Sequence, residues 1–125
     1  MLVVDDEHDA VAFLDAILKE QGFEVISAND GEACLNKARF DSPDLVILDV
    51  ELPKINGFDV FKMLRDDERT EHIPVIILTG IEEKLGIGFS KEGMKDLYHE
   101  EPQAYLEKPI EPDIVISTVK RILQV

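Results

Sequence analysis

Two short runs of this sequence, Leu45–Leu48 and Val75–Leu78, are apolar at every position. A strand with one face in water alternates apolar and polar side chains, whereas a strand covered on both faces is apolar throughout. Both runs therefore predict central strands of a parallel sheet that carries helices on each side.

Strand-like and helix-like patterns alternate along the rest of the chain. Short apolar, β-branched segments predict strands at Leu2–Val4, Glu24–Ala28, Asp44–Leu48, Pro74–Thr79 and Ala104–Leu106. Helical spacing of apolar residues predicts helices over Asp9–Glu20, Asp30–Phe40, Gly57–Arg65 and Asp113–Leu123, with Lys91–His99 as a further helical segment. This alternation predicts an α/β fold with a five-stranded, doubly wound parallel sheet flanked by helices. Right-handed crossovers would then place the carboxyl ends of all strands along one edge, where such folds bind ligands.

Length and charge limit what the chain can be. Its 125 residues suit a single domain, which we expect to cover residues 1–125. The 27 acidic residues against 13 Lys and Arg give a net charge of -14, which repels nucleic-acid phosphates and anionic membranes. Direct binding to nucleic acid or to membranes is therefore not expected. The single cysteine, Cys34, allows no internal disulfide, and the sequence shows neither a membrane span nor a signal peptide, so we expect a cytoplasmic protein.

Chemically reactive side chains stand at the ends of four predicted strands. Asp5 and Asp6 follow the first strand, and Asp49 follows the third. Thr79 ends the fourth strand, and Lys108 follows the last. Any one such residue has an ordinary explanation, because a strand-end Asp often caps the next helix and a Lys often lies on the surface. Three carboxylates gathered at one edge, however, repel one another and need a cation to hold them together.

Oxygen ligands in a partly hydrated cluster favour Mg²⁺, although Mn²⁺ and Ca²⁺ are also compatible with them. Lys108 precedes Pro109, which disfavours helix at the residue before it and so keeps Lys108 extended along the sheet edge. Its ammonium can pair there with Asp49 and then with an oxygen of a phosphoryl group. Gly80 leaves open space beside Thr79, which suits a hydroxyl that approaches a bulky anion.

Together these residues resemble the receiver domain of response regulators in bacterial two-component signalling. The matching segments follow the family's order over nearly the whole chain: Val3–Glu7, Leu48–Pro53 with Asn56–Gly57, Ile77–Gly80 and Tyr105–Pro109. The resemblance implies the flavodoxin-like receiver fold. It also implies that Asp49 is the phosphoacceptor, and that Mg²⁺ is bound by Asp5, Asp6, Asp49 and the backbone carbonyl of Glu51.

The resemblance implies a switch as well. Thr79 and Lys108 would hold the phosphoryl oxygens, with Lys108 assisting Asp49 in the transfer. Tyr105 would rotate inward when Thr79 moves toward the new charge, and the surface near the last strand and helix would change.

The resemblance further implies a set of partners. The phosphoryl donor would be a histidine kinase or a histidine phosphotransfer protein. A downstream protein would bind the face made by strands four and five and the last helix, and a homodimer is compatible with such a domain. The chain would not be an enzyme beyond catalysing its own phosphorylation and slow dephosphorylation.

The segment between the last two strands departs from the family's pattern. Lys108 stands 29 positions after Thr79, and the usual Gly-Ala-rich approach to the last strand is absent. We therefore expect an altered, longer region over residues 81–103, from which neither partner identity nor dimer geometry can be inferred. Two positions tune the lifetime of the phosphoryl group in the family, and Glu51 and Ile81 stand at them here. Ile81, two residues after Thr79, cannot orient an attacking water by hydrogen bonding, which favours slow hydrolysis. The effect of Glu51 on this lifetime has no clear sign. We expect a long-lived phosphorylated state.

Two other functions stay open at this point. One is a receiver-like module that binds partners without being phosphorylated, against which the intact set of Asp49, Thr79 and Lys108 counts. The other is a phosphatase with an aspartyl-phosphate intermediate. Such enzymes commonly place a second acid two residues after the nucleophile, as Glu51 stands here, but the chain is too short for a substrate-capping domain.

Overall fold

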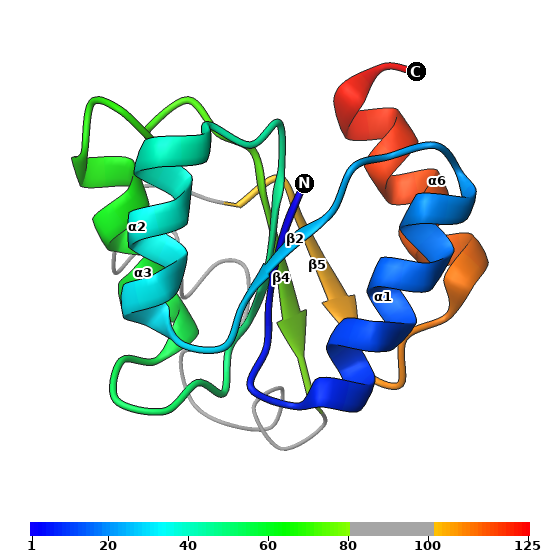
Figure 1. The fold of residues 1–125 in the computed structure, drawn as a ribbon, viewed down its shortest axis with the longest axis horizontal. Coiled ribbons are helices and arrows are strands. Elements are labelled where there is room, and N and C mark those ends of the chain that lie inside the picture. The colour runs from blue at the N-terminus through cyan, green and yellow to red at the C-terminus, as the bar shows by residue number, and fades with distance from the viewer. Residues whose placement is uncertain (81–101) are drawn as a thin grey trace.

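The computed structural model describes residues 1–80 and 102–125 and shows one sheet with helices on both faces (Figure 1). The elements follow in the order β1 (Leu2–Val4), α1 (His8–Glu20), β2 (Ile26–Ala28), α2 (Gly31–Asp41), β3 (Val46–Asp49), α3 (Gly57–Asp66), β4 (Val75–Thr79), β5 (Ala104–Glu107) and α6 (Pro112–Leu123). The five strands are parallel and lie in the order β2-β1-β3-β4-β5. The predicted five-stranded, doubly wound α/β fold is confirmed.

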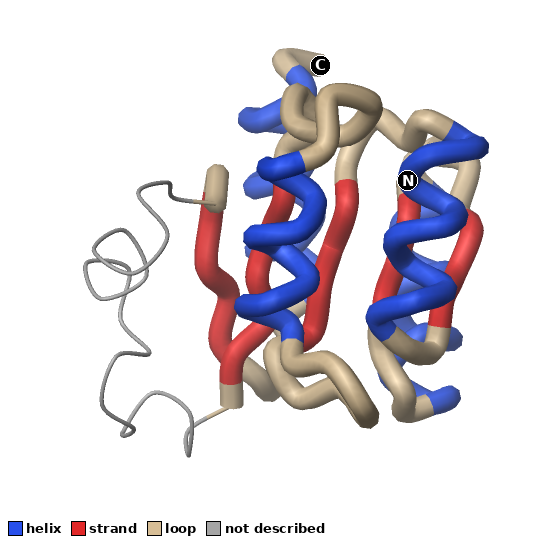
Figure 2. Tube along the Cα trace, turned by 90° about the vertical axis from the view of Figure 1, so that its left-hand side faces the viewer, coloured by secondary structure: helices blue, strands red, loops and turns tan. Residues whose placement is uncertain are grey.

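Two apolar clusters cover the two faces of the sheet. One packs against α1 and α6 and the other against α2 and α3, which lie on opposite sides of the sheet in Figure 1. Along β3, Ile47 faces the first cluster and Leu48 the second, and neither is exposed to solvent. Figure 2 shows the strands side by side with the helices lying along them. The runs without alternation are thus central strands, as predicted.

Strand β2 is shorter and more exposed than the sequence predicts. The prediction covers Glu24–Ala28, whereas the strand covers Ile26–Ala28 and only Ala28 is buried. Because β2 lies at an edge of the sheet, it has one neighbour among the described strands, β1, and less of its surface is covered. Strand β3 includes Asp49 as its last residue, one position beyond the predicted end.

The ends of the helices follow from local chemistry. Asp30 and Asn56 are N-caps whose side-chain oxygens accept hydrogen bonds from the N–H groups of Ala33 at 2.8 Å and Asp59 at 3.0 Å. Each bond satisfies a donor that the first turn of a helix leaves without an internal partner. After α1 the chain turns at Gly22 with φ +90, a conformation that glycine adopts without strain. Glycine just beyond the last turn is a common way for a helix to end.

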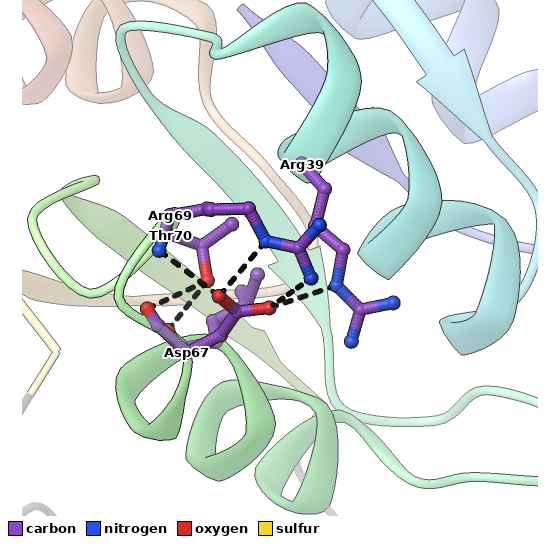
Figure 3. A network of polar contacts seen from close by, with 5 residues as sticks. Arg39, Asp67, Arg69 and Thr70 are labelled. Atoms are coloured by element: carbon purple, nitrogen blue, oxygen red, sulfur yellow. Dashed lines mark hydrogen bonds and ion pairs between the residues drawn. The ribbon is translucent and has the colours of Figure 1, made fainter.

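A polar network joins α2 to the segment that follows α3. Asp67 accepts from Nε of Arg39 on α2 at 2.9 Å and from Nη2 of Arg69 at 3.0 Å (Figure 3). The hydroxyl of buried Thr70 donates to the carbonyl of Leu64 at 2.6 Å. The network therefore fastens the chain between α3 and β4 to a neighbouring helix.

Several sequence-based predictions lie outside the described residues. They are the helix over Lys91–His99, the position of Ile81 and most of the altered region 81–103. Within the described ranges, no helix is both long and apolar enough to cross a membrane.

Candidate functional site

Three carboxylates meet at the carboxyl ends of β1 and β3. Asp5 and Asp6 directly follow β1, and Asp49 ends β3. One carboxylate oxygen from each of the three lies within 4.8 Å of the others. Asp5 is 1% exposed and Asp49 2%, whereas Asp6 is exposed. The cluster is therefore buried on one side and reaches solvent through Asp6.

Backbone N–H groups orient the two buried carboxylates. Oδ1 of Asp5 accepts from the N–H of Glu7 at 3.0 Å, and Oδ1 of Asp49 accepts from the N–H of Glu51 at 3.3 Å. In each case an Asp side chain bonds the backbone two residues further on, which is a common way for Asp to stabilise a turn. The Oδ2 atoms of both carboxylates point instead toward a shared cation.

That cation is the ammonium of Lys108. Its Nζ lies 3.3 Å from Oδ2 of Asp5 and 3.3 Å from Oδ2 of Asp49. Lys108 directly follows β5, and its backbone N–H donates to the carbonyl of Thr79 at 2.7 Å. Its peptide bond to Pro109 is cis. The edge of the sheet thus brings together side chains from β1, β3 and β5, as the sequence predicts.

Burial and repulsion set the protonation of this cluster. Burial raises the pKa of Asp49 to about 7, and the charge of Asp5 adds to this, while Lys108 and the N–H of Glu51 act in the opposite direction. Burial lowers the pKa of Lys108, but the carboxylates of Asp49 and Asp5 outweigh it and the net pKa is raised. The cluster therefore holds more negative charge than one ammonium offsets.

This set of ligands fits a hard divalent cation. All three side chains offer carboxylate oxygens, and one of them is open to solvent, which suits an ion that keeps several waters, such as Mg²⁺. Mn²⁺ accepts the same ligands. The raised pKa of Asp49 shows that its ionised form is unfavourable in the cluster. A bound cation would stabilise that ionised form. Glu51, whose carbonyl was predicted as a further ligand, is exposed and lies two residues after Asp49.

Thr79 and Tyr105 lie on adjacent strands near this edge. Thr79 is the last residue of β4, is 5% exposed and pairs in register with Glu107. Tyr105 pairs with Ile77 and packs, partly buried, against the cluster that faces α2 and α3. Because residues two apart on a strand share a face, Thr79 and Tyr105 are diagonal neighbours on one face of the sheet. The structure therefore places the two predicted switch residues on the same face of adjacent strands.

Gly57 has a role that the sequence motif did not reveal. Its N–H donates to the carbonyl of Val50 at 2.8 Å. A Cβ at this position would lie 2.3 Å from the carbonyl oxygen of Asp49 and 2.7 Å from Cα of Val50. Only glycine lets the start of α3 pack this closely under the end of β3, which fixes the backbone of Asp49.

Comparison with known proteins gives consistent matches over nearly the whole chain. Residues 1–120 match the family described as the response regulator receiver domain. The alkaline phosphatase synthesis transcriptional regulatory protein PhoP of Bacillus subtilis (strain 168) is 40% identical over 125 residues, 99% of this chain and 48% of PhoP. The polar-differentiation response regulator DivK of Brucella ovis is 35% identical over 124 residues, 98% of this chain and 94% of DivK. The chain thus spans about half of PhoP and nearly all of DivK.

Solved structures show the same fold. The chemotaxis response regulator CheY4 of Vibrio cholerae is similar with a TM-score of 0.81 and 26% identity, covering 97% of this chain and 95% of that one. The receiver domain of a signal transduction histidine kinase from Syntrophus aciditrophicus is similar with a TM-score of 0.82 and 27% identity, covering 98% of this chain and 88% of that one. Both likenesses therefore cover nearly the whole length of this chain.

Proposed function

Because this chain belongs to the response regulator receiver domain family, we propose that it is a phosphoacceptor whose phosphorylated residue is Asp49. The observation that carries the proposal is the contact of one ammonium, that of Lys108, with both buried carboxylates, Asp5 and Asp49, beside the exposed Asp6. One edge of the sheet therefore holds a nucleophile, an ammonium that can bind the phosphoryl group after transfer, and a set of metal ligands. The donor is the phosphohistidine of a histidine kinase or phosphotransfer protein.

Transfer begins with attack by a carboxylate oxygen of Asp49 on the phosphorus of the donor. The oxygen–phosphorus bond forms as the phosphorus–nitrogen bond breaks, and the leaving imidazole keeps the electron pair of that bond. Lys108 donates hydrogen bonds to the phosphoryl oxygens, which carry charge in the transition state. When bound by Asp5, Asp6, Asp49 and the carbonyl of Glu51, Mg²⁺ would neutralise further phosphoryl charge.

Phosphorylation changes the local charge, and the neighbouring strands respond. The acyl phosphate carries nearly two negative charges at a site that is already acidic. The hydroxyl of Thr79 is drawn toward it, and Tyr105, its diagonal neighbour, moves into the space that Thr79 leaves. The surface of β4, β5 and α6 then changes, and a downstream protein partner reads that change.

Other parts of the proposal rest on the sequence. The receiver domain extends over residues 1–125, and its only catalysis is its own phosphorylation and slow dephosphorylation. The net charge of -14 opposes direct contact with nucleic acid and with anionic membranes. A cytoplasmic location, a homodimer and a long-lived phosphorylated state stay predictions.

The decisive experiment measures the intact mass of the protein after incubation with Mg²⁺ and acetyl phosphate. We expect one phosphoryl adduct in the unaltered chain and in Asp44→Asn, a control at an exposed aspartate outside the site. The adduct is expected to be absent in Asp49→Asn and after chelation of Mg²⁺.

The alternatives give different results in the same experiment. If neither acetyl phosphate nor a phosphorylated histidine protein modifies the chain, the proposal is wrong and a phosphorylation-independent interaction module takes its place. Repeated turnover of added phosphoesters, measured as released phosphate, would instead indicate a phosphatase. An adduct that persists in Asp49→Asn would place the phosphoacceptor at another residue.

A further inference from the structure

Gln103 connects the beginning of β5 to the beginning of β4. Its backbone N–H donates to the carbonyl of Val75 at 2.9 Å, and its side-chain oxygen Oε1 accepts from the N–H of Val75 at 2.7 Å. One residue therefore bonds both main-chain polar groups of Val75. Because Val75 is fully buried, its N–H needs an acceptor from the protein, and a side chain supplies it in place of a strand carbonyl.

The same side-chain oxygen is also bonded to α3. Nη2 of Arg65, in the last turn of that helix, donates to Oε1 of Gln103 at 3.1 Å. Arg65 is itself held in place, since its Nη1 donates to the carbonyl of Ile73 at 2.8 Å and its guanidinium lies 4.8 Å from the centre of the Phe61 ring. Gln103 is thus joined to a helix and a strand whose positions do not depend on β5.

Strand β5 lies at the edge of the sheet, so among the described strands its register depends on β4 alone. A slip of one residue would turn every side chain of β5 to the other face. A slip of two would move the strand by roughly 6–7 Å. Either change would carry Lys108 away from carboxylates that now lie 3.3 Å from its ammonium. The register of β5 is therefore part of the geometry of the site.

We propose that Gln103 is a positioning residue for the phosphorylation site. Its two bonds to Val75 fix the start of β5, and the bond from the Lys108 N–H to the Thr79 carbonyl, 2.7 Å long, fixes its end. Between them the strand holds the Lys108 ammonium against Asp49. The chemical consequence rests on the proposed function, whereas the structural consequence does not.

A matched pair of variants isolates the side-chain oxygen of Gln103. Gln103→Glu keeps an acceptor for the N–H of Val75 and for Arg65, whereas Gln103→Met keeps the length of the side chain and loses the acceptor. Gln21→Met places the same residue at an exposed position after α1 and is the control. With acetyl phosphate and Mg²⁺, we expect phosphorylation of Gln103→Met to be ~10-fold slower, because small misplacement of a catalytic group is costly. Gln103→Glu and Gln21→Met are expected to react at rates close to that of the unaltered chain.

Two further measurements separate positioning from a general loss of structure. In the proposed function Mg²⁺ is bound by Asp5 and Asp6, which follow β1, and by Asp49 at the end of β3. Gln103→Met is therefore expected not to weaken Mg²⁺ affinity, whereas a general loss of structure would. The effect of Gln103→Met on the rate is also expected to disappear in a Lys108→Ala background, because the two substitutions remove the same contribution. Full additivity of the two substitutions would show that Gln103 does not act through Lys108.

Hydrogen exchange of backbone amides, measured by NMR, tests the position of β5 without any phosphorylation. In Gln103→Met we expect ~10-fold faster exchange at the Lys108 N–H, through local opening of β5. The Val46 N–H, which donates to the carbonyl of Pro74 at 2.9 Å, is expected to stay protected. If the unaltered chain accepts no phosphoryl group but exchange changes in this way, the proposed function fails and the positioning role stands. If Gln103→Met matches Gln103→Glu in both rate and exchange, the positioning role is overturned.

Discussion

Among single residues, Asp49 shows most clearly that the site is built at a cost to the fold. A carboxyl group in water has a pKa of about 3.9. In the folded chain, burial and then the charge of Asp5 raise the pKa of Asp49 to about 7. The folded state therefore binds a proton there more tightly than the unfolded state does, and ionisation of Asp49 works against folding. Lys108 offsets only part of this, since it is shared between two carboxylates.

The first prediction is that Asp49→Asn stabilises the protein when no Mg²⁺ is present. The penalty from Asp49 is absent below about pH 4, grows as the pH rises toward 7 and is complete above it. We expect the variant to be more stable by on the order of 1 kcal/mol at about pH 8, less than the pKa shift alone implies because structural relaxation and water near the cluster reduce the cost of the buried charge. Thermal unfolding across this pH range measures the difference, which should vanish near pH 4. A variant that is less stable than the unaltered chain at about pH 8 would contradict the argument.

The second prediction concerns two buried glycines. A Cβ at Gly57 would lie 2.3 Å from the rigid carbonyl oxygen of Asp49, whereas one at Gly31 would lie 2.6 Å from a side-chain methyl of Val60. A methyl group can shift more easily than a strand backbone. We therefore expect Gly57→Ala to cost about 2–3 kcal/mol of unfolding free energy and Gly31→Ala less. Chemical denaturation measures both values. If Gly31→Ala costs as much as Gly57→Ala or more, the backbone at the end of β3 shifts more easily than its packing implies.

At the scale of whole elements, the sequence predicts best what local patterns determine. The runs Leu45–Leu48 and Val75–Leu78 identified the central strands because burial on both faces leaves a direct mark on composition. The strand ends then placed Asp49 and Lys108 at one edge, since parallel strands share a direction. The predicted strand for β2 begins too early, because apolar Val25 continues the strand-like pattern but does not pair with β1.

Contacts between distant segments could not be predicted in this way. In the sequence, Gln103 is an ordinary polar residue with no visible partner. Its side chain bonds Val75, which is far away in the chain, and only the folded structure brings the two together. The same holds for Gly57, whose sequence motif suggests a turn but not the close contact with the carbonyl of Asp49. A single sequence contains the residues of such contacts but not their partners.

The third prediction concerns the network that joins α2 to the chain after α3 (Figure 3). Hydrogen bonds from Arg69, with a further one from Arg39, hold the pKa of Asp67 well below its usual range. A lowered carboxyl pKa contributes stability at neutral pH that is lost as the pH falls below the ordinary Asp value of about 4. We expect Asp67→Asn to lower the thermal midpoint at neutral pH, with the difference shrinking in acid. Asp66→Asn, which breaks only an exposed ion pair with Lys62, is expected to have a smaller effect. Equal effects would show that the hydrogen bonds of Asp67, including the one from Arg39 on α2, contribute no more stability than an exposed ion pair.

Over the whole molecule, repulsion among surface charges and repulsion within the site both lower the stability of the folded state. The chain carries a net charge of -14, and the cluster of Asp5, Asp6 and Asp49 adds a concentrated repulsion at one edge of the sheet. Dissolved salt weakens the first by screening, whatever its chemistry. A cation bound by the cluster weakens the second, and it does so only in the folded state, where the three carboxylates are close together.

The last prediction separates these two contributions. Raising NaCl is expected to increase the thermal midpoint gradually, because screening reduces repulsion between exposed carboxylates. Millimolar Mg²⁺ at constant ionic strength is expected to add a further stabilisation, which approaches about 2.7 kcal/mol when its concentration is 100 times its dissociation constant. Asp6→Asn removes an exposed ligand without disturbing the core, so we expect it to abolish the Mg²⁺ effect and keep the NaCl effect. If Mg²⁺ stabilises Asp6→Asn as strongly as the unaltered chain, the ion acts on the surface at large, and the three carboxylates are not its site.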